Sequence, residues 1–273
     1  MSAPRNDGPI GVFDSGVGGL SVLRHIRALL PHEDLLYIAD SGNAPYGDKP
    51  PDWIRERSIA LAGWLAGRSA KAIVIACNTA TAAAAGALRE RFALPVIGME
   101  PAVKPAAAAT KTGVVGVLAT VGTLKSAQFA ALLDRFASGI EVVTQPCPGL
   151  VECVERGELD DPATQELVSR YVAPLLARGA DTIVLGCTHY PFLRPLIAGA
   201  AGPQVALIET GGAVARQLER RLHETAVARH HEMRGRDAFY ASGDADLAAR
   251  VMRRLWADDT PVEPLPASLA QPA

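Results

Sequence analysis

Two segments of this 273-residue chain, separated by 110 residues, are near-copies of each other. Ala72–Thr79 and Asp181–His189 each contain a β-branched apolar run that ends at a cysteine, Cys77 in the first and Cys187 in the second. A small polar residue then opens a stretch of helical character. A cysteine at this boundary would lie beside the partial positive charge of a helix N-terminus, which lowers the pKa of a thiol. The repeat predicts two strand-to-helix turns that each carry an activated thiol.

A second pair of similar segments supports an internal repeat. Gly11–Leu20 resembles Gly116–Leu124 at an offset of 105 residues. Because the two offsets are so similar, the chain is predicted to form two similar α/β domains. We expect residues 1–100 and about 208–256 to form the first domain and residues 101–207 to form the second.

Short apolar runs alternate with longer stretches of helical period throughout the chain, which is typical of α/β folds with mainly parallel sheets. The expected strands are Ile10–Phe13, Leu35–Ile38, the two cysteine runs and Val114–Leu118, and the expected helices are Leu20–Leu30, about Trp53–Arg68, Leu124–Phe136, one that starts at Pro162 and about Gly212–His223. In open parallel sheets, ligands bind beyond the carboxyl ends of the strands, where both cysteines would lie. If the two domains face each other, a ligand in the cleft between them would contact both thiols. Residues 257–273, rich in Pro, Ala and Asp, are predicted to be a disordered tail.

Charge and hydropathy narrow the class of partner. The chain has 27 Lys and Arg against 29 Asp and Glu, with neither sign gathered in a tail, so we expect neither a nucleic acid nor a membrane as partner. No segment approaches the roughly 18–20 apolar residues that span a bilayer, and the first residues lack the apolar run of a secretory signal. We expect a cytoplasmic protein with a small polar ligand. The spacing of the four cysteines suits neither a disulfide framework nor a zinc site.

The glycine-rich segment Gly16–Ser21 leaves a competing interpretation open. It follows a predicted strand, and Asp40 ends the next one, which imitates a dinucleotide-binding fingerprint. The alternative is therefore a nicotinamide-dependent oxidoreductase. Against it, Ser21 replaces the third glycine, and Asp14 would bring a carboxylate against a pyrophosphate. A non-catalytic protein that binds an amino acid is the third candidate.

A metal site is not expected. Cys187 and His189 could both ligate a metal, but a zinc site needs three or four convergent ligands and no other cluster supplies them. Asp14 and His189 are instead candidates for tuning the thiol nearest to each, because both are expected at strand ends.

Four motifs together resemble the cofactor-independent aspartate/glutamate racemase family. They are Phe13–Leu20, Ala44–Gly47, Ala76–Ala80 and Gly186–Pro191. The resemblance extends from Pro9 to about Leu222. It implies two α/β halves with the site between them, and inversion at Cα of free glutamate with no cofactor and no metal.

The resemblance also implies roles for individual residues. Cys77 and Cys187 match the two bases, one for each face of Cα, with Asp14 as the helper of Cys77 and His189 as the helper of Cys187. Glu155 matches a further catalytic glutamate of the family. The implied substrate contacts are Asp14, Ser15, Tyr46, Gly47, Asn78, Thr79, Thr120, Thr188 and His189.

The substrate and setting follow from the same resemblance. Family members that act on aspartate tend to carry Glu after the second Cys-Thr, so His189 favours glutamate, and aspartate or another small amino acid remains the alternative. The implied role is supply of D-glutamate for peptidoglycan, and the implied assembly is a homodimer. Two bases are chemically necessary because a proton must leave one face of Cα and return to the other without the substrate turning over.

Overall fold

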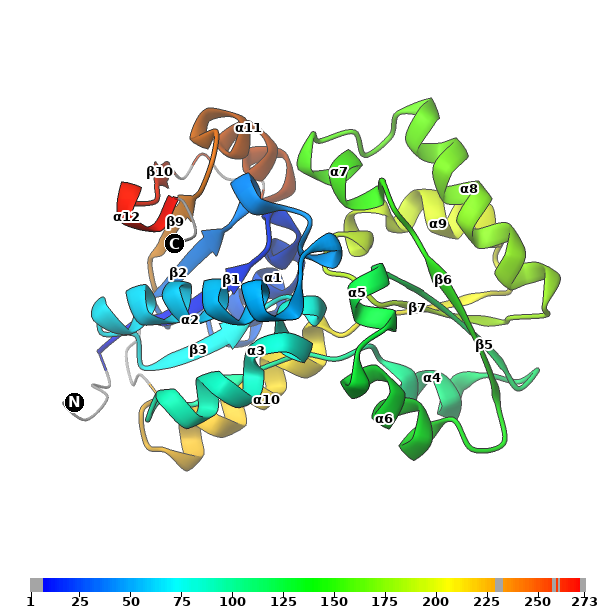
Figure 1. The fold of residues 1–273 in the computed structure, drawn as a ribbon, viewed down its shortest axis with the longest axis horizontal. Coiled ribbons are helices and arrows are strands. Elements are labelled where there is room, and N and C mark those ends of the chain that lie inside the picture. The colour runs from blue at the N-terminus through cyan, green and yellow to red at the C-terminus, as the bar shows by residue number, and fades with distance from the viewer. Residues whose placement is uncertain (1–6, 229–232, 257–258, 260, 271–273) are drawn as a thin grey trace.

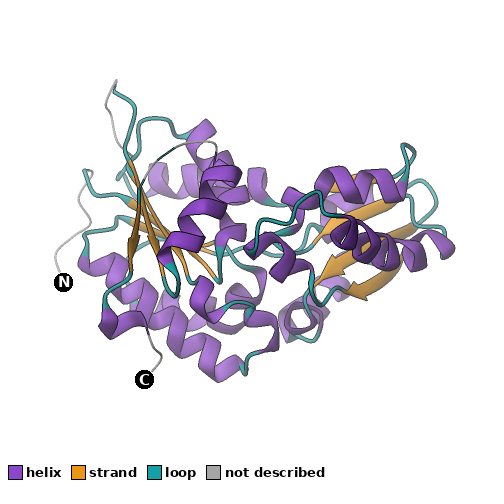
Figure 2. Cartoon of the chain, turned by 90° about the horizontal axis from the view of Figure 1, so that it is seen from above, coloured by secondary structure: helices purple, strands orange, loops and turns teal. Residues whose placement is uncertain are grey.

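The strands of the chain form two separate parallel sheets. The computed structural model describes residues 7–228, 233–256, 259 and 261–270. One sheet has six strands in the order β10-β9-β2-β1-β3-β4, and the other has four in the order β6-β5-β7-β8. Figures 1 and 2 show the two groups of strands side by side, each flanked by helices. The predicted α/β class, with two mainly parallel sheets, is confirmed.

The six-stranded sheet is built around β1. Its strands are β1 (Ile10–Asp14), β2 (Leu35–Ala39), β3 (Ala72–Ile75), β4 (Val96–Ile97), β9 (Asp237–Ala241) and β10 (Val262–Pro264). All five residues of β1 are buried, as expected for a central parallel strand covered on both faces. Because side chains alternate along a strand, Val12 and Phe13 belong to different hydrophobic clusters on opposite faces.

Helices cover both faces of this sheet, and we call the assembly the first half. On the Val12 face lie α1 (Leu20–Leu29), α10 (Gly211–Glu224) and α11 (Ala245–Trp256); on the Phe13 face lie α2 (Pro51–Gly67) and α3 (Asn78–Arg91). The helix α10 follows the second sheet in sequence but packs against α1. Three 3-10 turns and one short helix complete this half: η1 (Val17–Gly19), η2 (Ser41–Asn43), η3 (Tyr46–Asp48) and α12 (Ala267–Ala270).

The four-stranded sheet and its helices form the second half. Its strands are β5 (Val114–Ala119), β6 (Glu141–Pro146), β7 (Thr182–Leu185) and β8 (Ala206–Ile208). Leu118 packs with α8 (Pro162–Ala177) and α9 (Arg194–Ala201), whereas Val117 packs with α4 (Val103–Ala109) and α6 (Ala127–Phe136). Three short elements lie between this sheet and the first half: α5 (Val121–Leu124), α7 (Leu150–Glu155) and η4 (Tyr190–Leu193).

Several elements differ from the sequence prediction. The helix expected over 124–136 begins later, at Ala127, because the Ser126 hydroxyl accepts the Phe129 N–H at 3.1 Å and caps α6, while Leu124 ends the separate short helix α5. The prediction that residues 257–273 are disordered is wrong for the part that the structure describes. There β10 pairs with β9, and Leu265 is buried against the first half. A strand of three residues is too short to give a readable period.

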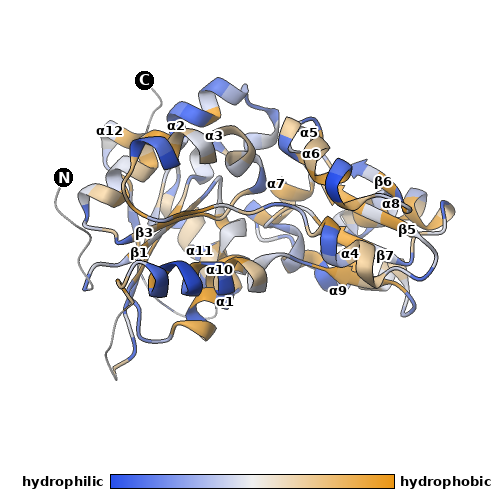
Figure 3. Cartoon of the chain, turned by 90° about the horizontal axis from the view of Figure 1, so that it is seen from below, coloured by the Kyte–Doolittle hydropathy of each residue, from blue (hydrophilic) through white to orange (hydrophobic). Residues whose placement is uncertain are grey.

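The division into domains stays a prediction, although the strands are distributed in a similar way. Strands between residues 10 and 97 and between 237 and 264 form one sheet, and those between 114 and 208 form the other. In Figure 3 the helices carry hydrophilic and hydrophobic residues along the same element, as expected for helices with one face in water. None of the helices in the described ranges has the length and apolarity needed to cross a membrane.

Candidate active site

The two repeated cysteines meet at one cavity. Cys77 lies two residues beyond β3 of the first half, and Cys187 lies two residues beyond β7 of the second half. Both thiols line one small, largely enclosed cavity at the carboxyl ends of the strands, as the fold predicts. The other residues of the lining are Ser15, Pro45, Tyr46, Gly47, Asn78, Thr79, Thr120, Thr123, Val151, Gly186, Thr188 and His189.

Cys77 is the N-cap of α3. Its Sγ accepts the backbone N–H of Ala80 at 3.4 Å, and the thiol lies 3.8 Å from the hydroxyl oxygen of Ser15. The predicted position at a helix start is therefore correct, but the predicted lowering of the pKa is wrong for this thiol. Burial raises the pKa of Cys77 strongly, the negative charge of Asp14 raises it further, and the bond from Ala80 offsets only part of this. Cys77 needs a partner that takes its proton.

Asp14 is the carboxylate nearest to that thiol in the hydrogen-bond network. It ends β1, is fully buried, and accepts the N–H of Gly19 at 2.6 Å. Its Oδ1 accepts the N–H of Ser15 at 2.7 Å and faces the Ser15 hydroxyl at 3.3 Å. Burial raises the pKa of Asp14 to about 6. A carboxyl with this pKa can exchange a proton near neutral pH, and the Ser15 hydroxyl links it to Cys77.

Cys187 has a different environment. The sequence predicted a helix start directly after it, but the 3-10 turn η4 comes first, from Tyr190, and the helix α9 begins only at Arg194. Its neighbour is instead the imidazole of His189, with Sγ 3.7 Å from Nδ1. The other ring nitrogen, Nε2, lies 2.5 Å from Oε1 of Glu155. Burial alone would lower the pKa of His189, but the contacts with Cys187 and Glu155 outweigh it and hold that pKa well above 6.5.

Glu155 belongs to the second half but is held by the first. It ends α7, and its Oε1 accepts the backbone N–H of Val17 at 2.7 Å. Its Oε2 accepts the hydroxyl of Ser41 at 2.7 Å. The series of contacts from Cys187 through His189 to Glu155 therefore ends at two groups of the first half. Each thiol is connected through one intermediate side chain to one carboxylate.

The glycine motif has a steric function in this arrangement. A Cβ on Gly16 would lie 1.9 Å from Oε1 of Glu155, and one on Gly18 would lie 2.2 Å from Nδ1 of His189. The two glycines therefore leave the space that side chains of the second half occupy. Since a dinucleotide fingerprint uses such glycines to admit a pyrophosphate, this geometry does not support the oxidoreductase alternative.

Polar groups for a ligand gather between the thiols. The hydroxyl oxygens of Thr79, Thr120 and Thr123 form a triangle with sides of 2.9, 3.0 and 3.0 Å. Asn78 is buried, and neither polar atom of its side chain has a hydrogen-bond partner in the described part of the chain. Buried amides are nearly always paired, so this side chain indicates a polar ligand in the cavity.

Tyr46 reaches the cavity on a braced loop. Its hydroxyl donates to Oδ2 of Asp40 at 2.5 Å, and Arg57 holds both oxygens of that carboxylate, at 2.8 Å through Nε and 2.5 Å through Nη2. Asp40 and Arg57 are buried, so this ion pair is shielded from water. The brace fixes the position of Tyr46 and of Gly47, which packs against Thr120.

The structure brings all the site residues predicted from the sequence to one place. Ten of them line the cavity, and Asp14 and Glu155 lie behind it, in contact with Thr188 and His189. Sequence reasoning missed Thr123 and Ser41. The spacing from Thr120 could have revealed Thr123, because the Thr120 side chain caps α5 by accepting the Thr123 N–H. No local signal marks Ser41.

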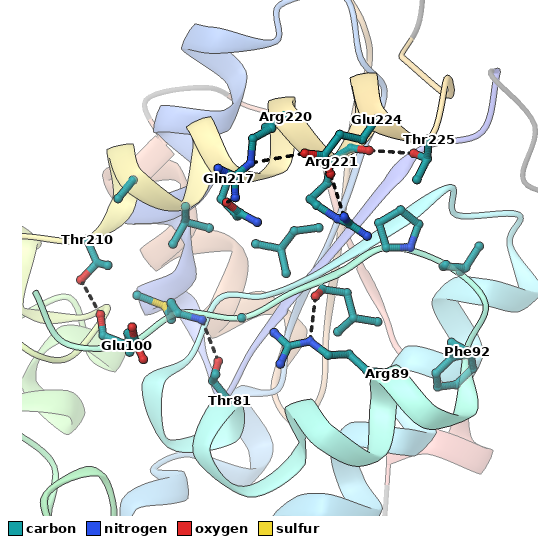
Figure 4. Close-up of a pocket in the computed structure, with 18 of the residues that line it drawn as sticks. Thr81, Arg89, Phe92, Glu100, Thr210, Gln217, Arg220, Arg221, Glu224 and Thr225 are labelled. Atoms are coloured by element: carbon teal, nitrogen blue, oxygen red, sulfur yellow. Dashed lines mark hydrogen bonds and ion pairs between the residues drawn. The ribbon is translucent and has the colours of Figure 1, made fainter. Parts of the chain in front are cut away.

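A wider groove lies away from the thiols. It has a volume of about 990 Å³ and runs between α3, β4 and α10. Figure 4 shows Arg89 on one side and Arg221 and Glu224 on the other, with Arg221 paired to Glu224 at 2.7 Å. None of its lining residues is a cysteine or a predicted site residue, so the narrower cavity is the candidate active site.

The chain is similar over most of its length to proteins of a known family. The family model described as Asp/Glu/Hydantoin racemase matches residues 10–218. The glutamate racemase of Methylococcus capsulatus is 58% identical over 265 residues, which are 97% of this chain and 98% of that relative.

Solved structures show the same likeness. A glutamate racemase from Escherichia coli, in complex with L-glutamate and an activator, has a TM-score of 0.83 and 33% identity over 94% of this chain and 98% of its own. One from Francisella tularensis, in complex with D-glutamate, has a TM-score of 0.83 and 29% identity over 96% of this chain and 98% of its own.

Proposed function

Because the chain belongs to the Asp/Glu/Hydantoin racemase family, we propose that it is a glutamate racemase that interconverts L-glutamate and D-glutamate. One observation carries this proposal. Two thiols from different halves line a single cavity, and each has its own route to a carboxylate. Inversion of a stereocentre by proton transfer needs one acid-base group for each face of the carbon, and this arrangement supplies two.

The polar lining supports an amino-acid substrate. Relatives that carry the name glutamate racemase have been solved with L-glutamate and with D-glutamate, and the chain covers nearly all of both. The unpartnered amide of Asn78 and the hydroxyls of Thr79 and Thr120 can donate to carboxylates. Thr188, whose hydroxyl donates to Asp14 at 3.2 Å, lies beside Cys187. We assign Ser15, Tyr46 and Gly47 to the same binding surface.

The proposed mechanism uses the two thiols in turn. The thiolate of one cysteine removes the Cα proton, and the thiol of the other protonates the opposite face. Ser15 and Asp14 serve Cys77, and His189 and Glu155 serve Cys187. Since burial raises the pKa of Cys77, the thiolate forms only when its proton can pass to a group such as Asp14, whose pKa is about 6. Donors at the substrate carboxylate stabilise the negative charge that develops as Cα loses its proton.

Proton exchange tests the proposal directly. Purified protein in heavy water, with no cofactor added, should exchange the Cα proton of both L- and D-glutamate, as followed by proton NMR. Exchange with neither enantiomer would refute the proposal. The same exchange assay on a panel of amino acids that includes aspartate decides which one is the substrate. An oxidoreductase would instead bind a nicotinamide dinucleotide and change its absorbance, and a binding protein would gain thermal stability from glutamate with no exchange.

The cellular role, location and assembly remain part of the proposal. D-glutamate made by this reaction would supply peptidoglycan synthesis. All four cysteines are free thiols, which agrees with a location in the reducing cytoplasm. We propose a homodimer on the basis of the family resemblance, and the mass of the protein in solution tests it.

A further inference from the structure

One hydrogen bond from the first half completes the proton chain of the second. The Oε2 atom of Glu155 accepts the hydroxyl of Ser41 at 2.7 Å, while Oε1 is shared between His189 and the N–H of Val17. Ser41 does not line the cavity between the thiols. Its hydroxyl therefore acts on Glu155 and not on a ligand.

We propose that Ser41 is a positioning residue for racemisation, which orients Glu155 and, through it, the His189 that serves Cys187. The proposal deepens the function proposed above and rests on it. Its basis is the position of Ser41 on η2, directly after the buried Asp40 at the end of β2. The hydroxyl reaches across to the second half at a point 114 residues later in the chain.

The geometry explains why this one hydroxyl matters. The Val17 N–H and His189 both contact Oε1 of Glu155. The carboxylate could still turn about that atom, so its orientation depends on what holds Oε2. With Ser41 in place, both oxygens are fixed, and Oε1 stays 2.5 Å from Nε2 of His189. Without it, only the Val17 N–H and the imidazole itself restrain the carboxylate, which can turn more freely about its last bond, so the imidazole has a less fixed partner. A hydrogen bond to a charged group is roughly twice as strong as a neutral one, so this loss should be measurable.

The charged neighbourhood predicts the direction of the effect on pH dependence. The titratable groups that face His189 are Cys187, Glu155 and Asp14. Cys187 and Glu155 are responsible for the high pKa of His189. When Glu155 is no longer held in place, the pKa of His189 falls, and the limb of the pH profile that depends on this imidazole moves to lower pH.

The test compares Ser41→Ala with two further variants. We expect Ser41→Ala to lower kcat/KM about tenfold, equally in both directions because the equilibrium is symmetric, with little change in KM. The primary deuterium isotope effect should rise for the enantiomer that Cys187 deprotonates and not for the other. Ser41→Thr, which keeps the hydroxyl, should restore most of the rate. Ser41→Gly tests the same hydroxyl if the alanine variant folds poorly.

Ser242→Ala is the matched control. The Ser242 hydroxyl accepts the N–H of Gly42 at 3.0 Å, so it ties down the same loop without touching Glu155. If Ser242→Ala reproduces the isotope effects and the pH shift of Ser41→Ala, loosening of the loop explains them and the proposal is overturned. Native rates in Ser41→Ala and Ser41→Gly would also overturn it. Native protein that exchanges neither enantiomer overturns the proposed function itself.

Discussion

His189 is held between a thiol and a carboxylate, with Nε2 2.5 Å from Oε1 of Glu155 and Nδ1 3.7 Å from Sγ of Cys187. Both contacts favour the protonated ring, which is why its pKa lies well above the usual value despite full burial. Among the described residues, the side chain bonded to the Cys77 thiol is not an imidazole but the hydroxyl of Ser15, which in turn contacts the carboxylate of Asp14. The two thiols are therefore served by different chemistry.

Removal of either thiol should abolish racemisation. We expect Cys77→Ala and Cys187→Ala each to lower kcat by at least about a hundredfold, because a positioned acid-base group typically contributes that much or more. A coupled assay of D-glutamate formation measures the rate. Cys153→Ala is the control, since Cys153 is buried outside the cavity and contacts Arg156. Substantial activity in either single-thiol variant contradicts the two-base scheme.

A methyl group on Gly16 should act as a wedge against Glu155. The backbone φ of Gly16 is −169°, an extended value that alanine also adopts, so Gly16→Ala should fold. Its Cβ would lie 1.9 Å from Oε1 of Glu155 and displace the carboxylate, with a loss of kcat/KM of about tenfold or more. Circular dichroism checks that the variant folds, and steady-state kinetics measure the loss of kcat/KM.

Gly63→Ala provides the control for this wedge. Gly63 is exposed on α2, and no atom lies within 4 Å of the position that its Cβ would take. Alanine there should keep activity and raise the free energy of unfolding by about 0.5–1 kcal/mol. Native activity in Gly16→Ala would show that Glu155 does not need its present position.

Asp14 should make stability depend on pH in a defined window. Its pKa is about 6 in the folded protein against 3.8 in the unfolded chain, so the folded state binds more protons between these values. The free energy of unfolding therefore falls as pH rises from about 4 to 6, by as much as about 3 kcal/mol from this group.

Asp14→Asn removes that dependence. The variant keeps one acceptor oxygen for the two N–H groups of Gly19 and Ser15, and this loss costs stability at every pH. Its deficit relative to the native protein should nevertheless shrink between pH 4 and pH 7. Urea unfolding at several pH values measures it. A deficit that grows with pH would mean that burial does not raise the pKa of Asp14.

The brace behind Tyr46 should matter for both stability and binding. Arg57→Met leaves the Asp40 carboxylate buried without its cation, and breaking such a pair costs about 3–5 kcal/mol. The KM for glutamate should rise, because Tyr46 donates to the same carboxylate. Arg170→Met, which removes an exposed pair with Glu166, should change the unfolding free energy by less than about 1 kcal/mol. Equal effects of the two variants would contradict the structural importance of the buried pair.

Much of the fold was readable because its central strands are buried on both faces. The runs that end near Cys77 and Cys187 are continuous and rich in β-branched residues, and each thiol lies two residues beyond its strand as expected, although only Cys77 caps a helix. The edge strand β6 was missed because it is partly exposed and includes Glu141 and Gln145. The strand β9 was missed because its place beside β2 depends on pairing across about 200 residues.

The site was predictable as a set of residues but not as an arrangement. Motif positions indicated Glu155, but nothing local shows that it is anchored by Val17 and Ser41, at separations of 138 and 114 residues. The pKa of Cys77 was predicted in the wrong direction, because a position at a helix start can be read from sequence whereas depth of burial depends on everything packed around it.

The anchoring of Glu155 has a consequence for how such a protein can be divided or recombined. A fragment that contained only the second half would still carry Cys187, His189 and Glu155, yet it would lack the backbone amide and the hydroxyl on which the carboxylate rests. Chimeras that combine the first half of one relative with the second half of another can retain every reactive group. We expect them to be active only where Gly16, Val17 and Ser41 keep the positions in which they contact Glu155.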